Sequence, residues 1–352
     1  MIDRKLKQID RRIVELLGER MSLLDSEAKF PAREEQIDSL TSLLRLWGVP
    51  KEVWSQIVDS CIDSLKTSLP TAAERSRRVT IVGGRGRMGR FFVRQLTAAN
   101  HRVEILGRED WDKAELLLGK SELVLISVPI EQTLATIDRI AKYISSDTAI
   151  ADLTSIKTEP VARMLARHSG PVMGLHPMFG PSKSSFNAQK IAVCPGRHDS
   201  SFQWFLDLMS DRGGELVFCQ PQEHDRLMAI VQAVRHFSQF GFGVFLTAEE
   251  IDRDRSLSLA SPNYRSEYEA IERFFGQNPS MYIDIMLATK TSCQTIERLA
   301  KNYRYLADLV AKKDREALIR VFTSTKDAFN RSKQELSSES EFSQSVVSAL
   351  KT

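Results

Sequence analysis

The strongest constraint on the fold is a glycine-rich turn between a β-branched run and a helical stretch. Residues 79–82 are typical of a short buried strand, and residues 90–99 have helical character. Between them, Gly84, Gly86 and Gly89 form a GxGxxG motif. The first glycine permits the tight bend, the second lets the backbone approach a pyrophosphate, and the third lets the helix pack closely on the strand. The pattern predicts a dinucleotide-binding βαβ unit.

Composition excludes several other classes of protein. Of the 352 residues, 42% are hydrophobic and 27% charged, which is ordinary globular composition rather than disorder. A formal net charge of +3 gives no reason to expect a nucleic-acid or membrane partner. No apolar run approaches the ~20 residues that span a bilayer. Four dispersed cysteines form no metal-binding or disulfide pattern, so we expect a cytoplasmic protein without a bound metal.

The hydrophobic periodicity divides the chain into three parts. Residues 1–70 have helical spacing in three runs, broken near Phe30-Pro31 and at residues 48–50, and predict a small helical domain. Residues 77–220 alternate strand and helix, which predicts a Rossmann-type, doubly wound parallel sheet. Residues 221–352 carry helical signals. The expected fold class is therefore multidomain α and α/β, with a helical segment at each end.

Short apolar runs mark the expected strands. The four clearest lie at residues 79–82, 102–106, 123–126 and 149–153. Three later runs are predicted to extend the same parallel sheet, at residues 172–175, 191–193 and 215–218. Ligands of such sheets bind outside the carboxyl ends of the strands. The residues that follow each strand are therefore the candidate site.

The end of the second strand leaves the choice of coenzyme open. NAD enzymes usually have an acidic residue there, which binds the ribose hydroxyls. In this chain Gly107 stands at that position, and Arg108 next to it is suited to a 2′-phosphate. Alternatively, Glu109 or Asp110 substitutes for the acid from the loop. The cofactor is therefore NAD or NADP. The expected coenzyme contacts are Gly84, Arg85, Gly86, Met88, Gly89, Arg108, Val128 and Pro129.

Three segments beyond strand ends supply candidate catalytic residues. Ser127 follows the third strand and is interpreted as a site residue, although it would also serve as a helix N-cap near Pro129. Lys157 follows the fourth strand, where a site role and a structural role are both open. His176 lies in residues 174–181, a run dense in glycine and proline. A histidine held there is well placed as a base near a nicotinamide.

The helical part adds three candidate residues. Gln232 and His236 are four residues apart and therefore share one face of the expected helix. Arg265 follows a turn at residues 261–263 and is suited to a bidentate contact with a carboxylate. A surface arginine is more often only solvated, so the residues alone leave this role open.

Together these motifs resemble the prephenate dehydrogenase family, in its bifunctional T-protein form, in which a chorismate mutase is fused to the dehydrogenase. The resemblance covers nearly the whole chain and is most specific in residues 175–181 and 232–237. The other matching segments are residues 82–89, 124–130, 152–157, 223–237 and 261–265. The resemblance implies a Rossmann domain followed by an all-helical domain that makes a homodimer.

The resemblance also implies an activity, the oxidative decarboxylation of prephenate in tyrosine biosynthesis, with hydride transfer to NAD(P). His176 would accept the proton or hydrogen bond of the 4-hydroxyl group, and Ser127 would orient the same oxygen. Arg265 would bind a carboxylate of this small-molecule substrate. Gln232, His236 and Lys157 would contribute to substrate binding.

One departure from the family leaves the substrate open. Residues 266–269, Ser-Glu-Tyr-Glu, follow Arg265, where typical members continue with more apolar residues. Arogenate or 4-amino-4-deoxyprephenate is thus an alternative substrate with the same hydride chemistry. An alternative of another class is a catalytically silent, ligand-sensing relative. The presence of His176, Ser127 and Arg265 argues against this alternative.

Residues 1–70 depart further from the family. Its mutase site binds two carboxylates with arginines, and only Arg20 and Arg33 can be matched to that cage. The connection from the first helix to residues 31–34 is several residues shorter than in active members. We therefore expect a degenerate, mutase-like domain that now serves assembly or stability.

Overall fold

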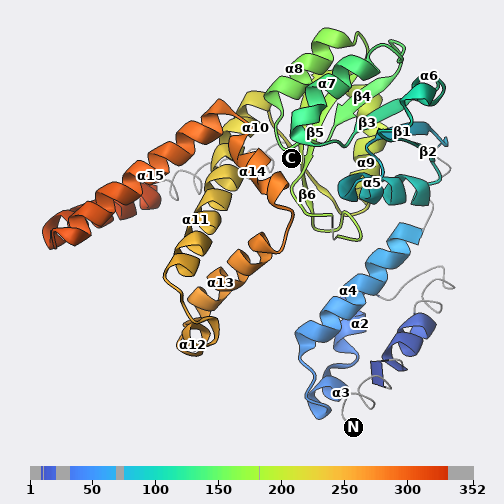
Figure 1. The fold of residues 1–352 in the computed structure, drawn as a ribbon. Helices are drawn as coiled ribbons and strands as arrows, with labels where there is room; N and C mark the ends of the chain where they lie inside the picture. Colours follow the sequence, from blue (N-terminus) through green and yellow to red (C-terminus); the bar gives the residue numbers. More distant parts are fainter. Residues whose placement is uncertain (1–8, 11, 21–31, 69–74, 182, 332–352) are drawn as a thin grey trace, which may run out of the picture. The chain divides into compact units, whose positions relative to one another are not determined.

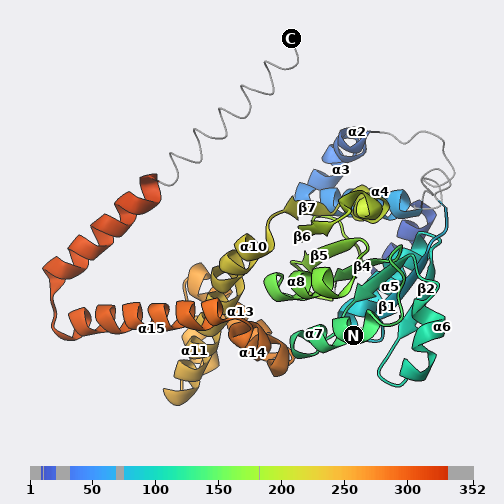
Figure 2. The same ribbon diagram turned by 90° about the horizontal axis from the view of Figure 1, so that it is seen from above.

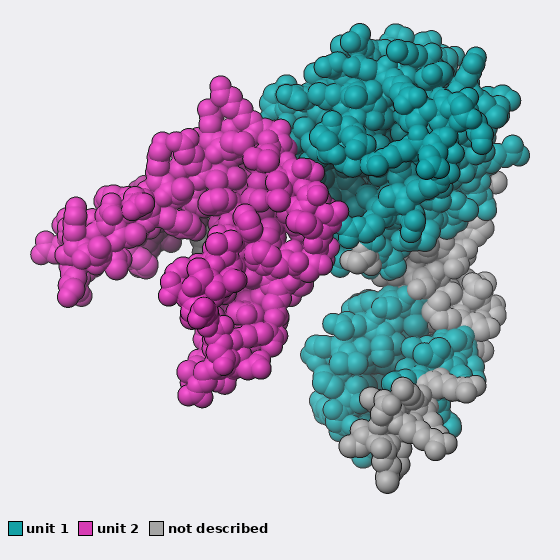
Figure 3. All heavy atoms as spheres, viewed as in Figure 1, with its two compact units in different colours: residues 1–225 teal, residues 226–352 magenta. Residues whose placement is uncertain are grey.

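The chain forms two compact units, residues 1–225 and residues 226–352 (Figure 3). The computed structural model describes residues 9–10, 12–20, 32–68, 75–181 and 183–331. The first unit holds a short helical region and a seven-stranded sheet. The described residues of the second unit form helices and their connections.

The seven-stranded sheet organises the first unit (Figure 1). Its strands are β1 (Arg78–Val82), β2 (Arg102–Leu106), β3 (Leu123–Ile126), β4 (Ala149–Asp152), β5 (Val172–Pro177), β6 (Lys190–Arg197) and β7 (Glu215–Phe218). They stand in the order β2-β1-β3-β4-β5-β6-β7. Figure 2 labels β7, β6, β5 and β4 in succession, with β1 and β2 towards the other end of the sheet. The chain passes from β1 outward to β2 and then returns to the other side of β1 as β3. The topological switch point, where doubly wound sheets bind ligands, therefore lies between β1 and β3.

The prediction of a wholly parallel sheet is wrong for the last two strands. β1 to β5 pair in parallel, but β6 is antiparallel to β5, with His176 opposite Ala192. β7 is parallel to β6 and so also runs against the first five strands. The connections explain this arrangement, because a parallel pair needs a crossover that is usually helical. The described residues between β5 and β6 contain no helix, and the chain simply reverses there.

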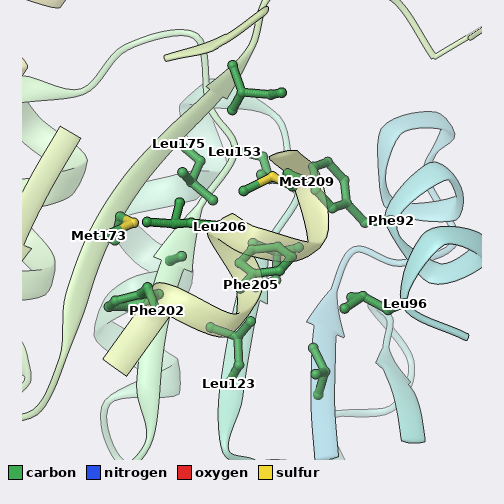
Figure 4. Packing of buried hydrophobic residues seen from close by; sticks show 14 of the residues in the cluster. Phe92, Leu96, Leu123, Leu153, Met173, Leu175, Phe202, Phe205, Leu206 and Met209 are labelled. Carbon is green, nitrogen blue, oxygen red and sulfur yellow. The ribbon is translucent and has the colours of Figure 1, made fainter. Parts of the chain in front are cut away.

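Helices cover both faces of the sheet because side chains alternate along each buried strand. These helices are α5 (Arg87–Ala98), α6 (Ala114–Leu118), α7 (Ile130–Ile140), α8 (Thr158–Arg167) and α9 (Gln203–Asp211). In β3, Leu123 and Leu125 face the core beneath α5 and α9, whereas Val124 and Ile126 face the core beneath α6, α7 and α8. Figure 4 shows the first core, in which Phe205 of α9 is fully buried. The two cores fix the strand ends in place.

Short helices precede the sheet. Residues 9–10 and 12–20 are helical, and α2 (Arg33–Asp38), α3 (Thr41–Leu46) and α4 (Lys51–Ser68) follow. A turn at residues 39–40 divides the predicted second helix into α2 and α3. The predicted break at Phe30-Pro31 lies outside the described residues.

The rest of the chain is helical. Its elements are α10 (Pro221–Met228), a π-helical segment η3 (Ala229–Val234), α11 (Arg235–Ala248), α12 (Arg253–Ser258), α13 (Pro262–Phe275), α14 (Pro279–Leu287) and α15 (Lys290–Ala311). Residues 315–331 are also helical. The predicted single helix over residues 281–310 is divided because Thr289 caps a new helix, its hydroxyl accepting from the Ser292 N–H at 3.0 Å. None of the described helices is long and apolar enough to cross a membrane.

Candidate active site

The glycine-rich turn between β1 and α5 forms the first part of the site. Gly83 has φ +82°, in the left-handed region, and a Cβ there would collide with the carbonyl oxygen of Ser127. A Cβ on Gly89 would collide with the carbonyl oxygen of Gly83, so α5 can approach the turn only because residue 89 is glycine. No side chain caps α5 at Gly86. The first N–H groups of α5 are thus available to an anion, and the turn fits the pyrophosphate of a dinucleotide.

Ser127 lies beside this turn, at the end of β3. Its backbone N–H donates to the carbonyl oxygen of Val82 at 2.8 Å, which places it at the switch point between β1 and β3. The N-cap residue of α7 is Pro129, and no side chain caps that helix. The structure therefore gives Ser127 no capping role, and its position favours a role in the site.

The arginines predicted to contact the coenzyme differ in their surroundings. Arg108 is exposed after β2. Arg85 pairs with Asp110, its Nη1 lying 2.8 Å from Asp110 Oδ2. Met88 is partly buried and packs against the core beneath α5. The sequence alone does not indicate that Arg85 is engaged by a carboxylate of the chain.

Lys157 lies inside the protein beyond β4. Its side chain and that of Asp152 are fully buried and form an ion pair. The Lys157 ammonium also donates to the carbonyl oxygen of Leu175 at 2.8 Å. Burial lowers the pKa of Lys157, whereas the Asp152 carboxylate opposes this shift. The ammonium ties the ends of β4 and β5 together, which favours a structural role over direct contact with a substrate.

Three buried polar residues, beginning with His176, are linked one to the next by hydrogen bonds. Nδ1 of His176 lies 2.9 Å from Nε2 of His224, and Nδ1 of His224 lies 2.8 Å from Oδ1 of Asp225. The Asp225 carboxylate in turn accepts the backbone N–H groups of Lys157, at 2.7 Å, and Thr158, at 2.9 Å. These two groups stand at the N-terminus of α8, where the helix dipole also stabilises a carboxylate. These three residues, His176, His224 and Asp225, are called the relay. Its Asp225 end is held in place by the two backbone N–H groups.

The direction of the hydrogen bonds in this relay decides where the protons are. An ionised Asp225 only accepts, so Nδ1 of His224 carries a proton. When Nε2 of His224 carries no proton, it accepts, and Nδ1 of His176 donates to it. In this arrangement the proton of a neutral His176 is on Nδ1, and its Nε2 has the lone pair of an acceptor. This arrangement suits His176 to act as a base.

The surroundings of the relay favour one ionisation state at each of its two ends, His176 and Asp225. Burial lowers the pKa of His176 well below its ordinary value, and the positive charge of Lys157 contributes to the same shift. Burial would raise the pKa of Asp225, but hydrogen bonds from His224, Thr158 and Lys157 lower it overall. At neutral pH, His176 is therefore neutral and Asp225 is ionised.

The predicted residues of the second unit lie on successive helical elements. Gln232 lies in η3, and His236 lies in the first turn of α11. π-helical turns are rare and occur frequently at functional sites. The His236 ring packs against Tyr282 with 4.6 Å between ring centroids, and burial lowers its pKa to about 4. Arg265 is exposed at the start of α13, where it donates to the carbonyl oxygen of Leu257 at 3.0 Å.

The two arginines matched to the mutase cage have partners within the chain. Arg33 donates from Nε and Nη2 to the two carboxylate oxygens of Asp59, at 2.5 and 2.8 Å. Arg20 donates to Gln36 at 2.5 Å, and its guanidinium lies 5.4 Å from the centroid of the Trp54 ring. The bidentate face of Arg33 is therefore already occupied by a carboxylate.

The partners that prepare His176 were not predicted as site residues. The sequence places His224 and Asp225 at the start of a helix, and His224 is 48 positions away from His176. The only indication in the sequence is that a histidine stands next to an aspartate. This pair does not predict which residue it contacts in the fold. Asp152 was predicted only as part of a strand. These roles depend on the fold bringing β5, α8 and α10 together.

Comparisons with known proteins agree on one family. The model for the nucleotide-binding domain of prephenate dehydrogenase matches residues 97–218, and the model for its dimerization domain matches residues 220–324. The chain is 33% identical to the T-protein of Enterobacter agglomerans over 341 residues. The alignment covers 92% of this chain and 91% of that protein.

Solved structures share the fold. Prephenate dehydrogenase from Aquifex aeolicus, in complex with hydroxyphenyl propionate and NAD+, superposes with a TM-score of 0.58 at 20% identity, over 73% of this chain and 98% of that one. Arogenate dehydrogenase from Synechocystis has a TM-score of 0.53 at 18% identity, over 72% of this chain and 99% of that one. At these identities the similarity establishes the fold alone.

Proposed function

The chain belongs to the prephenate dehydrogenase family, and we propose that it converts prephenate to 4-hydroxyphenylpyruvate and CO2 with NAD(P) as the oxidant. The observation that supports this proposal is the buried relay, in which His176 is hydrogen-bonded to His224 and His224 to Asp225. His176 follows Gly174, whose register partner is Asp152 at the end of β4. This position, near the carboxyl ends of the parallel strands where doubly wound folds bind their ligands, supports His176 as the proposed base.

A bound nicotinamide dinucleotide supplies the acceptor for the hydride that leaves C4 of the substrate. Its pyrophosphate fits the turn formed by Gly84, Gly86 and Gly89, at the N-terminus of α5. Val128 and Pro129 follow Ser127 at the neighbouring strand end and are proposed to contact the coenzyme. All other steps fall to side chains of the protein.

His176 handles the proton of the reaction. Its Nε2 accepts the 4-hydroxyl proton while the C4–H bond breaks and its electron pair leaves as hydride. The bond between the ring and its carboxylate then breaks, CO2 departs, and the released electron pair makes the ring aromatic. The phenolic oxygen takes the proton back from His176. Asp225 stabilises the transient imidazolium through His224, as a positioning residue.

The remaining residues bind and orient the substrate. Ser127 is proposed to orient the 4-hydroxyl oxygen. In the second unit, Arg265 is proposed to bind a carboxylate, which suits an exposed guanidinium. Gln232 and His236 are proposed to line the substrate pocket. The buried position of Lys157 supports a part in positioning His176 through the ends of β4 and β5.

We further propose three functional parts and a homodimer. Residues 1–70 form a mutase-like helical domain without useful mutase activity, residues 77–220 the Rossmann domain, and residues 221–352 the helical substrate-binding and dimerisation domain. The match of residues 220–324 to a dimerization domain supports the homodimer. The free cysteines support a reducing, cytoplasmic setting.

An assay that crosses three substrates with two coenzymes tests the proposed function. Prephenate, arogenate and 4-amino-4-deoxyprephenate are each supplied with NAD and with NADP, and nicotinamide reduction is followed by absorbance. We expect the highest kcat/KM with prephenate. A higher value with either amino compound would replace the substrate but keep the chemistry. No reduction with any pair would refute the proposed activity and favour a ligand-sensing relative.

A further inference from the structure

A carboxylate stands at the end of β2 although the residue there is glycine. Residues 107–110 form a turn in which the Asp110 N–H donates to the carbonyl oxygen of Gly107 at 3.3 Å. The turn brings the Asp110 side chain back, and its Oδ2 accepts the Gly107 N–H at 2.8 Å. A Cβ built on Gly107 would lie 3.0 Å from this oxygen. The Asp110 carboxylate therefore lies beside the strand end, where the side chain of an acidic residue 107 would begin.

This carboxylate is charged and held in place. The pKa of Asp110 is lowered, first by the hydrogen bond from the Gly107 N–H and then by the Arg85 guanidinium. The Asp110 side chain is 18% exposed, against 59% for Arg85. Its other oxygen, Oδ1, has no hydrogen-bond partner among the described residues, so it can accept further hydrogen bonds.

The same contact occupies the arginine nearest to the strand end. Arg85 stands between the first two glycines of the GxGxxG motif, and its Nη1 lies 2.8 Å from Asp110 Oδ2. A Cβ on Gly107 would collide with this Nη1, so only glycine lets Arg85 take this position. A 2′-phosphate that sought Arg85 would have to displace the Asp110 carboxylate or stand beside it. The Asp110 carboxylate and a neighbouring phosphate are both negative and would repel each other. The arrangement therefore discriminates against a coenzyme with a 2′-phosphate.

We propose that Asp110 is the coenzyme-selecting residue, that it replaces the missing strand-end acid as acceptor for the ribose hydroxyls, and that the chain therefore prefers NAD to NADP. Arg85 braces Asp110 and does not serve as a phosphate receptor. The identity of the ligand rests on the proposed dehydrogenase function, but the selecting role of Asp110 does not depend on the substrate.

Direct binding of the reduced coenzymes to the full-length protein tests the proposal. NADH and NADPH are titrated separately and followed by nicotinamide fluorescence, without substrate. Asp110→Asn is nearly isosteric and keeps an oxygen for the Gly107 N–H. We expect this variant to bind NADH about tenfold more weakly, because a hydrogen bond to a charged acceptor is lost. NADPH should bind more tightly than to the wild type, because the repelling carboxylate is gone and Arg85 is released.

Two further variants separate this explanation from others. Asp112→Asn removes an exposed carboxylate two residues away and should leave both affinities unchanged. Adding Arg85→Ala to Asp110→Asn should abolish the gain in NADPH affinity, and circular dichroism confirms that each variant is folded. An unchanged ratio of the two dissociation constants in Asp110→Asn would overturn the proposal and leave the dehydrogenase function intact. Failure of the wild type to bind either coenzyme would instead overturn the proposed function.

Discussion

Two polar clusters of the first unit each contain a carboxylate, and the position of that carboxylate distinguishes them. In the relay, Asp225 does not touch His176, the residue proposed to react. His224 lies between them and is hydrogen-bonded to both. In the N-terminal helices, Asp59 binds Arg33 directly and takes two of its donors. A carboxylate at the far end of a chain of hydrogen bonds prepares the last group for a ligand, whereas one in direct contact occupies that group.

Burial reinforces this difference. His176, His224 and Asp225 are buried, so their hydrogen bonds must be satisfied within the protein and have fixed directions. Arg33 and Asp59 are partly exposed, with 46% and 42% of the side chains accessible. Such an exposed ion pair contributes little to stability, but it occupies the bidentate face of the guanidinium. The comparison predicts one working site in the sheet and none among the N-terminal helices.

The largest effect is expected at the reactive end of the relay. His176→Asn should lower kcat by about 10²–10⁴-fold, the usual effect of removing a positioned acid–base group. Binding of NADH should barely change, because the glycine-rich turn is intact. Steady-state kinetics and a coenzyme titration measure the two effects. Turnover close to wild type would remove His176 from the mechanism.

A smaller effect is expected at the fixed end of the relay. Asp225→Asn can present an N–H to His224, which would reverse the hydrogen bonds and put a proton on Nε2 of His176. We expect kcat to fall about 10–10²-fold with little change in KM, and the acidic limb of the pH–rate profile to move. Glu223→Gln, an exposed neighbour that loses the same charge, is the control. If both variants behave alike, the relay has no directional role.

The proposed substrate arginine should affect binding more than turnover. Arg265→Ala should raise KM about tenfold and leave kcat within a few-fold, because a charge-assisted contact holds the ground state as well as the transition state. Arg255→Ala, another exposed arginine on the preceding helix, is the matched control. Equal KM values for the wild type and Arg265→Ala would show that the substrate carboxylate binds elsewhere.

The buried state of His176 should also appear in the pH dependence of stability. Its pKa is lowered in the folded protein, so the unfolded chain binds the proton more readily. The contribution of neutral His176 to the free energy of unfolding is fully present above the ordinary histidine pKa of about 6.5. It is lost as the pH falls towards the lowered pKa of the folded protein. Between pH 7.0 and 5.5, one such histidine removes about 1 kcal/mol of unfolding free energy. Urea unfolding should show a shallower pH slope for His176→Asn, and identical slopes would contradict a buried neutral ring.

The smallest effect is expected in the N-terminal helices. The full-length protein should convert chorismate little faster than buffer does, and Arg33→Ala should leave that rate unchanged because Asp59 already occupies the guanidinium. Chorismate consumption followed by absorbance measures both rates. A turnover on the order of 10 s⁻¹, an ordinary enzymatic value, would contradict the comparison and restore a second activity.

The sequence determined the parts of the molecule that depend on local patterns. The spacing of Gly84, Gly86 and Gly89 after a β-branched run predicted the phosphate-binding turn, because such a turn needs glycine at fixed positions. Apolar runs predicted the seven strands, and in β3 and β4 the reason is burial on both faces, which makes a strand apolar throughout. The glycine- and proline-rich run at residues 174–181, beyond a strand, indicated His176 as the candidate base.

Only the tertiary structure decided which distant residues meet. The direction of β6 was mispredicted, because an apolar run reads the same in a parallel and an antiparallel strand. The states of His176, Lys157 and Arg85 depend on His224, Asp152 and Asp110, which reach them through contacts between strand ends, helix starts and turns. A local sequence pattern indicates which residue is a candidate and which helix, strand or turn carries it. Its partner, its burial and hence its protonation are set by the packing of segments far apart in the chain.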